Sequence, residues 1–275
     1  MEKPLVVLDK DTICSSWNYF SQRLASGSAD KTFAIFDSLD SCFSSFFCTS
    51  KSKVHEAVGI WRVCADGTLS LWEEVVEDAQ PLQWKLCISF NSGSAQLLDT
   101  QIRVSPATLK MVIAYSNARA EFQSVIDSVS TVGHAICLFA SISWNPQRGE
   151  SQESSFVLGF NSNAPQLNSA KVSEFDQAHQ RWLPVAELAS PSDNGDQVYA
   201  VAWALNIGRP YEVIVVATHK GISIWHLGLN LDLDGRLSLE KIALLSGHKG
   251  EVWQMELDMS GMTLATTRND GAVRL

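Results

Sequence analysis

The 275-residue sequence lacks long apolar runs. A membrane-spanning helix needs about 18 consecutive apolar residues, and no stretch of the chain approaches that length. Near the N-terminus only four apolar residues follow one another, Leu5 to Leu8, which is too few for a signal peptide. We therefore expect no membrane insertion, and a protein of the cytosol or the nucleus.

Positive charge is also scarce. The chain has 30 acidic and 21 basic residues, which gives a formal net charge of −9, and Lys and Arg never cluster beyond a pair. Proteins that bind nucleic acids neutralise phosphates with basic patches, so a chain of this charge is repelled by a phosphate backbone. The charge balance predicts no direct binding of nucleic acid.

The motifs of metal centres and of common enzymes are missing. None of the six cysteines forms a Cys-x-x-Cys pair, and no His stands at zinc-ligand spacing from two of them. The cysteines are expected to be small buried hydrophobes in a reducing compartment. The Gly-x-Ser-x-Gly, phosphate-loop and His-Glu-x-x-His motifs are also absent. We predict no enzyme, no catalytic residue, no metal site and no cofactor.

An internal repeat is present instead. In residues 17–30 and 257–270, a large apolar residue precedes Leu-Ala-Ser/Thr by seven positions and an Asp by thirteen. A second piece recurs after the Asp, as a tight polar turn followed by an alternating strand that ends on a large ring. It occupies residues 30–37, 66–73 and 219–226. Alternation of this kind predicts half-buried β-strands.

The two pieces fit the WD repeat. That repeat has Gly-His, about 20 residues, an Asp in a turn and a strand ending in Trp-Asp, on a period of about 40–45 residues. Gly247-His248 and Asp270 give the best instance, in which the Asp follows the His by 22 positions. We predict an all-β, single-domain WD-repeat β-propeller over residues 1–275. Its six repeats are centred near residues 11–37, 52–75, 96–117, 137–176, 196–228 and 247–275.

In WD repeats, the His, the Asp, a strand Ser or Thr and the strand-ending Trp form a hydrogen-bonded set that pins each blade. A buried imidazole with both nitrogens bonded is a structural device, so these positions are predicted to be structural. His219-Lys220 stands in a blade turn in place of the Asp and is interpreted as turn variation. The predicted structural positions are Asp30, Asp66, Trp72, Trp225, His248, Thr266 and Asp270.

Three repeats depart from the pattern. Asp66 follows His55 by only 11 residues, which predicts that about one strand is absent from the second blade. The third repeat has no ring-ending strand after Asn117, and the last stops at Leu275, one residue short of its Trp. Blades 2, 3 and 6 are therefore expected to be incomplete, and the isolated chain to be of marginal stability.

Several segments resemble the SEH-type WD-repeat nucleoporins of plants. One of them, residues 177–188, lies outside the general WD pattern and makes the resemblance specific. The segments are residues 16–19, 66–74, 144–150, 177–188, 247–248 and 251–255.

The resemblance implies a scaffold subunit of the Y-shaped outer-ring complex of the nuclear pore, at the nuclear envelope, supporting transport of mRNA and protein. It also implies an open six-bladed propeller that a partner nucleoporin completes with one blade. Such an edge would leave unpaired backbone groups that invite strand pairing. The resemblance further implies that the subunit is shared with a nutrient-signalling complex, and hence a cytoplasmic or vacuolar-surface pool.

Two other placements stay open. A vesicle coat is the setting of the sister family. A ubiquitin-ligase substrate adaptor usually carries Trp-Asp-x-Arg at a strand end, whereas the strand ends here lack the Arg, as at Trp72-Glu73-Glu74-Val75.

Overall fold

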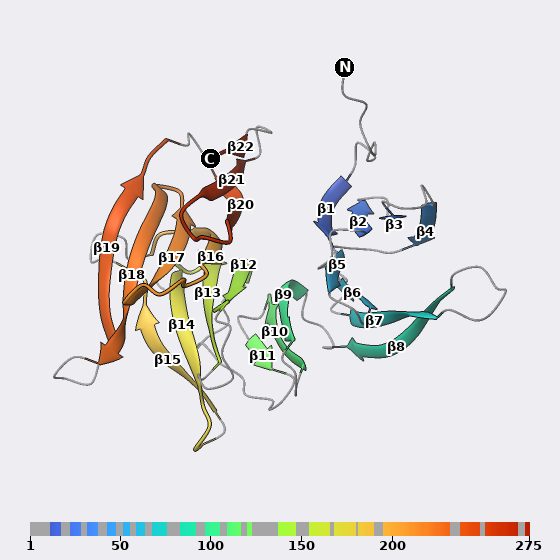
Figure 1. Cartoon of the computed structure of the whole chain (residues 1–275), viewed down its shortest axis with the longest axis horizontal. Coiled ribbons are helices and arrows are strands. Elements are labelled where there is room, and N and C mark those ends of the chain that lie inside the picture. The colour runs from blue at the N-terminus through green and yellow to red at the C-terminus, as the bar shows by residue number, and fades with distance from the viewer. Residues whose placement is uncertain are drawn as a thin grey trace. The chain divides into compact units, whose positions relative to one another are not determined.

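The computed structural model describes the strands and many of the turns of the chain (Figure 1). The described residues are 12–17, 23–28, 32–37, 43–47, 52–55, 59–63, 68–75, 83–91, 97–104, 109–116, 120–122, 137–146, 154–165, 168–179, 181–189, 195–231, 237–247, 251–268 and 273–275. They form 22 β-strands in six antiparallel sheets. Within this part of the chain there is no helix that could cross a membrane.

The chain divides into two compact units, residues 1–97 and 98–275. The first unit holds two sheets of four strands, each strand paired with the next in the chain. One sheet contains β1 (Thr12–Trp17), β2 (Arg23–Ser28), β3 (Thr32–Asp37) and β4 (Phe43–Phe47). The other contains β5 (Ser52–His55), β6 (Gly59–Val63), β7 (Thr68–Val75) and β8 (Gln83–Asn91).

The second unit holds four sheets, again paired in chain order. The third sheet is β9 (Leu97–Val104), β10 (Leu109–Tyr115) and β11 (Ala120–Phe122). The fourth is β12 (Cys137–Trp144), β13 (Ser155–Ser162), β14 (Ser169–Asp176) and β15 (Arg181–Glu187). The fifth is β16 (Val198–Trp203), β17 (Tyr211–Thr218), β18 (Gly221–Leu231) and β19 (Leu237–Leu245). The sixth is β20 (Val252–Leu257), β21 (Leu264–Arg268) and β22 (Val273–Arg274).

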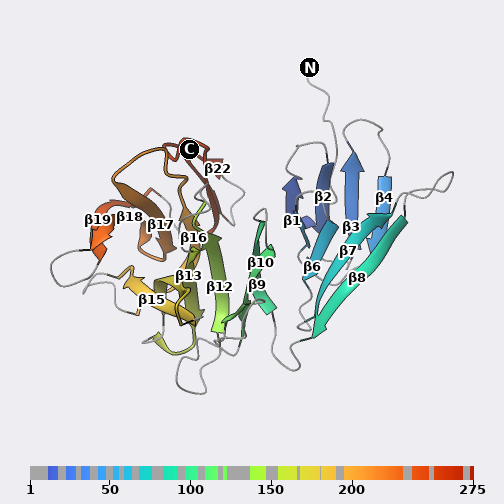
Figure 2. The same ribbon diagram turned by 60° about the horizontal axis from the view of Figure 1, so that its bottom comes forward.

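Successive sheets of the second unit meet along their first strands. β12 contacts β16, and β16 contacts β20. The last strands of the fourth and fifth sheets, β15 and β19, lie at the rim of the unit (Figures 1 and 2). Each first strand is therefore the inner strand of a blade.

The six sheets coincide with the six predicted repeats, which confirms the all-β fold and the count of blades. Over the residues that the structure describes, the third and sixth sheets have three strands each, as expected. The prediction that the second blade lacks a strand is wrong, because β5, β6, β7 and β8 form a four-stranded sheet. His55 is the last residue of β5, so the first strand of this blade precedes the His and only the five-residue strand β6 lies between His55 and Asp66.

The inner sheets are buried on both faces because a neighbouring sheet covers each face. All eight residues of β13 are buried. Since side chains alternate along a strand, Phe156 and Leu158 join the core facing the third sheet, and Val157 joins the core facing the fifth. A Cβ on Gly159 would lie 2.6 Å from Cγ1 of Val198 on β16. Glycine at this position therefore permits the close approach of the fourth and fifth sheets.

The hydrophobic core is consequently a series of layers, one between each pair of neighbouring sheets. Aromatic rings fill the layer between the third and fourth sheets, where Trp182 lies 4.9 Å from Phe156 and 6.0 Å from Trp144 between ring centroids. Trp182 comes from the 177–188 run that carries the resemblance. The layer between the fifth and sixth sheets uses smaller residues and contains Ala200, Ala202, Val215, Ala217, Ile222, Val252 and Met255.

Candidate functional site

The contacts between neighbouring sheets, called blade joints below, are the first candidate site. They show how one sheet of this chain binds the next. An inner strand pairs with only one neighbour, so alternate N–H groups along its other edge need acceptors from elsewhere. On β12, the N–H of Ile142 donates to Asp99 Oδ2 at 2.8 Å, and that of Trp144 donates to Gln101 Oε1 at 3.3 Å. Both acceptors stand on β9, the inner strand of the preceding sheet.

The next joint repeats this arrangement with shorter side chains. The N–H of Val201 on β16 donates to Ser141 Oγ at 3.1 Å, and that of Trp203 donates to Ser143 Oγ at 3.0 Å. In both joints, two acceptors two residues apart on one inner strand receive two N–H groups two residues apart on the next. The joint therefore fixes the register between neighbouring blades.

The sixth sheet ends the second unit with an exposed face. Val252 and Met255 of β20 point into the core shared with the fifth sheet, whereas Gln254 and Glu256 are exposed. Gln254 Nε2 donates to Glu256 Oε1 at 3.3 Å. Over the described residues, β22 is the edge strand of this sheet, and Val273 on it is 67% exposed. This face resembles the side of a sheet that packs against the following sheet in a blade joint.

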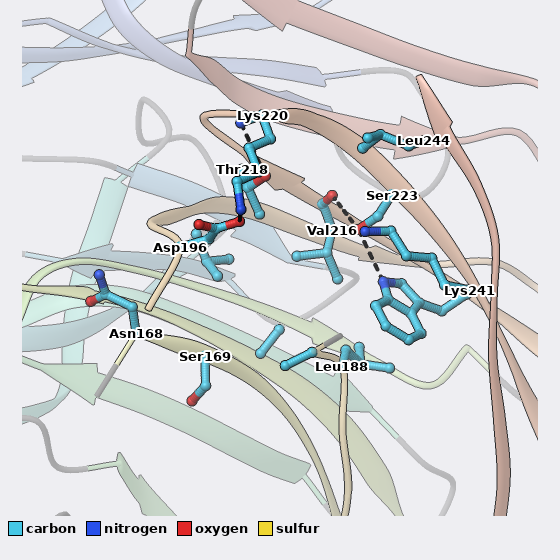
Figure 3. A pocket seen from close by; sticks show the side chains of 14 residues that line it. Asn168, Ser169, Leu188, Asp196, Val216, Thr218, Lys220, Ser223, Lys241 and Leu244 are labelled. Atoms are coloured by element: carbon cyan, nitrogen blue, oxygen red, sulfur yellow. Dashed lines mark hydrogen bonds and ion pairs between the residues drawn. The ribbon is translucent and has the colours of Figure 1, made fainter. Parts of the chain in front are cut away.

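Of the predicted WD positions, Trp225 and Thr266 are fully described. Trp225 on β18 is buried, and its indole N–H donates to Ser223 Oγ at 2.9 Å (Figure 3). The Ser223 hydroxyl in turn donates to the Val216 carbonyl at 3.2 Å. Thr266 is buried on the central strand β21.

The remaining predicted positions are described less fully or not at all. Trp72 lies on β7, where its backbone pairs with Ile60 on one side and Leu86 on the other. The positions outside the described residues are Asp30, Asp66, His248 and Asp270. The hydrogen-bonded set of the last repeat therefore stays a prediction.

The fifth blade contains an ion pair that the sequence pattern did not predict. Lys220, in the turn between β17 and β18, places Nζ 2.7 Å from Oδ2 of Asp196, which precedes β16. His219 Nε2 is 3.9 Å from Oδ1 of the same carboxylate. The WD pattern has the basic partner before the first strand and the Asp in the turn. In this blade the Asp stands before the first strand and the basic residues stand in the turn, so the turn variation at His219-Lys220 keeps a contact between the two places.

A small cavity lies beside this ion pair, between the fourth and fifth sheets (Figure 3). Its volume is about 20 Å³, and its lining includes Asp196, Lys220, Trp225 and Lys241. Such a volume holds about one water molecule, whereas pockets for organic ligands measure about 300–1,000 Å³. Among the residues that the structure describes, no group of three or more His, Cys, Asp or Glu side chains could hold a metal ion.

The 177–188 run forms the tip and second strand of the β14–β15 hairpin. The Asp176 carboxylate accepts hydrogen bonds from the backbone N–H of Ala178 at 3.0 Å and of His179 at 3.2 Å. It also lies 2.7 Å from His179 Nδ1. The hydrogen bond with the His179 side chain holds the pKa of Asp176 below its ordinary value of 3.8. The carboxylate therefore closes the turn at the exposed tip of the hairpin.

Six sheets of this topology, built on one repeating pattern, define a WD-repeat β-propeller. The WD domain, G-beta repeat family matches residues 239–275. A chain of the solved structure "Crystal Structure of Mitotic Checkpoint Complex" superposes on 97% of this chain and 78% of its own length, with a TM-score of 0.67 and 14% identity. The structure "Crystal structure of RRP9 WD40 repeats" superposes on 93% of this chain and 72% of its own, with a TM-score of 0.61 and 14% identity. These likenesses show the fold.

Sequence relatives show the family. Protein SEH1 of Arabidopsis thaliana is 54% identical over 306 aligned positions, which cover all of this chain and 94% of the relative. Nucleoporin SEH1-A of Xenopus laevis and Nucleoporin SEH1 of Homo sapiens are each 23% identical, over 94% of this chain and 79% of the relative. The chain belongs to the SEH1-type WD-repeat nucleoporins.

Proposed function

We propose that this chain is a non-enzymatic scaffold subunit of the Y-shaped outer-ring complex of the nuclear pore. It resides at the nuclear envelope and supports transport of mRNA and protein by holding partner nucleoporins in place. Identity of 54% to Protein SEH1 over the whole chain supports this function, as do relatives whose names contain the word nucleoporin. A scaffold role also suits a fold whose described cavity is of the size of one water molecule.

The observation that carries the proposal is the exposed face of the sixth sheet. Each pair of neighbouring sheets in the second unit buries a shared core. In contrast, the side chains of β20 that point away from the fifth sheet are exposed. A partner that adds one blade there extends the propeller, gaining affinity from main-chain hydrogen bonds and specificity from alternate side chains.

Affinity capture tests the placement. The tagged full-length chain is recovered from nuclear-envelope extract at physiological salt, and co-purifying proteins are quantified by mass spectrometry. We expect outer-ring nucleoporins in a constant ratio to the tagged chain. Recovery of cullin-ligase, vesicle-coat or nutrient-signalling subunits without any outer-ring nucleoporin would overturn the proposal.

A further inference from the structure

Two of the three joints of the second unit share one arrangement of hydrogen-bond acceptors. In the joint between the third and fourth sheets, the side chains of Asp99 and Gln101 receive two inner-strand N–H groups. In the joint between the fourth and fifth sheets, the hydroxyls of Ser141 and Ser143 do so. The residue types differ, but each pair consists of two oxygen acceptors spaced by two residues and directed toward the following blade.

The same positions can be followed along the chain. Ser141 and Ser143 stand three residues and one residue before Trp144, the last residue of β12. The equivalent residues before Trp203 on β16 are Ala200 and Ala202, which point into the core between the fifth and sixth sheets and have no side-chain acceptor. Acceptors at these positions are therefore not a general requirement of the fold.

On β20, residues with side-chain acceptors again occupy these two positions. Gln254 and Glu256 stand three residues and one residue before Leu257, the last residue of β20. Both side chains are exposed, and they bond to each other along the strand rather than to a following blade. Their chemistry matches the joint between the third and fourth sheets, where one carboxylate and one glutamine amide oxygen serve as the acceptors.

We propose that Gln254 and Glu256 are the positioning residues that set the register of the incoming partner strand. This inference rests on the proposed function, in which a nucleoporin adds a blade beside β20. The mutual bond between the two side chains opens, and their oxygens accept two backbone N–H groups of the partner that lie two residues apart. The partner segment is extended and has no proline at either position, because proline has no N–H to donate.

The donors at the two joints with acceptor pairs add a further requirement. The residues that donate are Ile142, Trp144, Val201 and Trp203. All four are large and apolar, and all four side chains are buried in the layer at their own joint. The partner strand is therefore expected to carry large apolar side chains at the two donating residues, which cover the exposed face of the sixth sheet.

The test uses the full chain bound to the outer-ring nucleoporin that co-purifies with it. The double variant Q254M/E256M removes both acceptors while keeping side-chain length, and the matched control Q254E/E256Q keeps an acceptor at each position. Dissociation is followed by surface plasmon resonance, and backbone protection in the partner by hydrogen exchange with mass spectrometry. Because both side chains are exposed, circular dichroism of the free variants should match that of the wild type.

We expect Q254M/E256M to dissociate about tenfold faster or more, since two hydrogen bonds are lost. It should also lose protection at two partner amides spaced by two residues, whereas Q254E/E256Q keeps both properties. A Q254M/E256M complex with wild-type dissociation and unchanged amide protection would overturn the positioning role and leave the proposed function intact. Failure of the wild-type chain to retain any outer-ring nucleoporin would overturn both.

Discussion

Removal of the hydroxyls at Ser141 and Ser143 should loosen the joint between the fourth and fifth sheets. The double change Ser141→Ala and Ser143→Ala takes the acceptors from the N–H groups of Val201 and Trp203, whose residues are buried. A buried donor left without a partner costs about 1–3 kcal/mol. Because the two hydroxyls are only half-buried, water replaces part of the loss, and we expect a total of about 2–4 kcal/mol.

Urea unfolding followed by tryptophan fluorescence measures this loss. A decrease of about 2–4 kcal/mol is a large share of the about 5–15 kcal/mol that stabilises a typical domain, so the midpoint should fall clearly. Ser238→Ala, at an exposed position of β19, is the matched control and should shift the free energy of unfolding by less than about 0.5 kcal/mol. A double variant no less stable than this control would refute the view that side-chain acceptors hold the joint together.

Three further changes test other parts of the fold. Gly159→Ala places a Cβ against Val198, so a loss of about 1–3 kcal/mol is expected in the same urea assay, and an unchanged midpoint would show that the sheets separate freely. Trp225→Phe removes the indole donor to Ser223 and should cost about 1–2 kcal/mol; equal stability would show that the bond is dispensable. Backbone N–H groups and the Ser260 hydroxyl lower the pKa of Asp258 to about 2, from an ordinary 3.8. Its contribution is therefore present above pH 3.8 and fades as the pH falls toward 2, so Asp258→Ala should flatten the acid dependence of the melting temperature in that range, and a variant with an unchanged acid profile would contradict this.

The repeat pattern was sufficient to predict the sheets, because period-two alternation and the spacing of turns are local properties of the chain. The spacing between His55 and Asp66 was a poor guide to the number of strands in the second blade, as β5 and β6 show. His55 lies at the end of β5 and not before the first strand of the blade, so the 11-residue spacing to Asp66 spans one strand, β6, and removes none.

The joints could not be predicted from the WD pattern. Asp99 and Ser141 share only the ability to accept a hydrogen bond, so a search for similar residues does not align them. The pair of Asp196 and Lys220 was missed for a related reason. Its Asp stands before the first strand and its basic residue in the turn, unlike the family pattern, and the contact depends on how the turn folds back toward the start of β16.

The most direct measurement is a cryo-electron microscopy structure of the full chain bound to the outer-ring nucleoporin that it captures. We predict a strand of the partner along β20, with two of its N–H groups within hydrogen-bond distance of Gln254 and Glu256. A complex in which this face of the sixth sheet stays bare, with the nucleoporin attached elsewhere, would contradict the proposal that the partner completes the propeller at this edge.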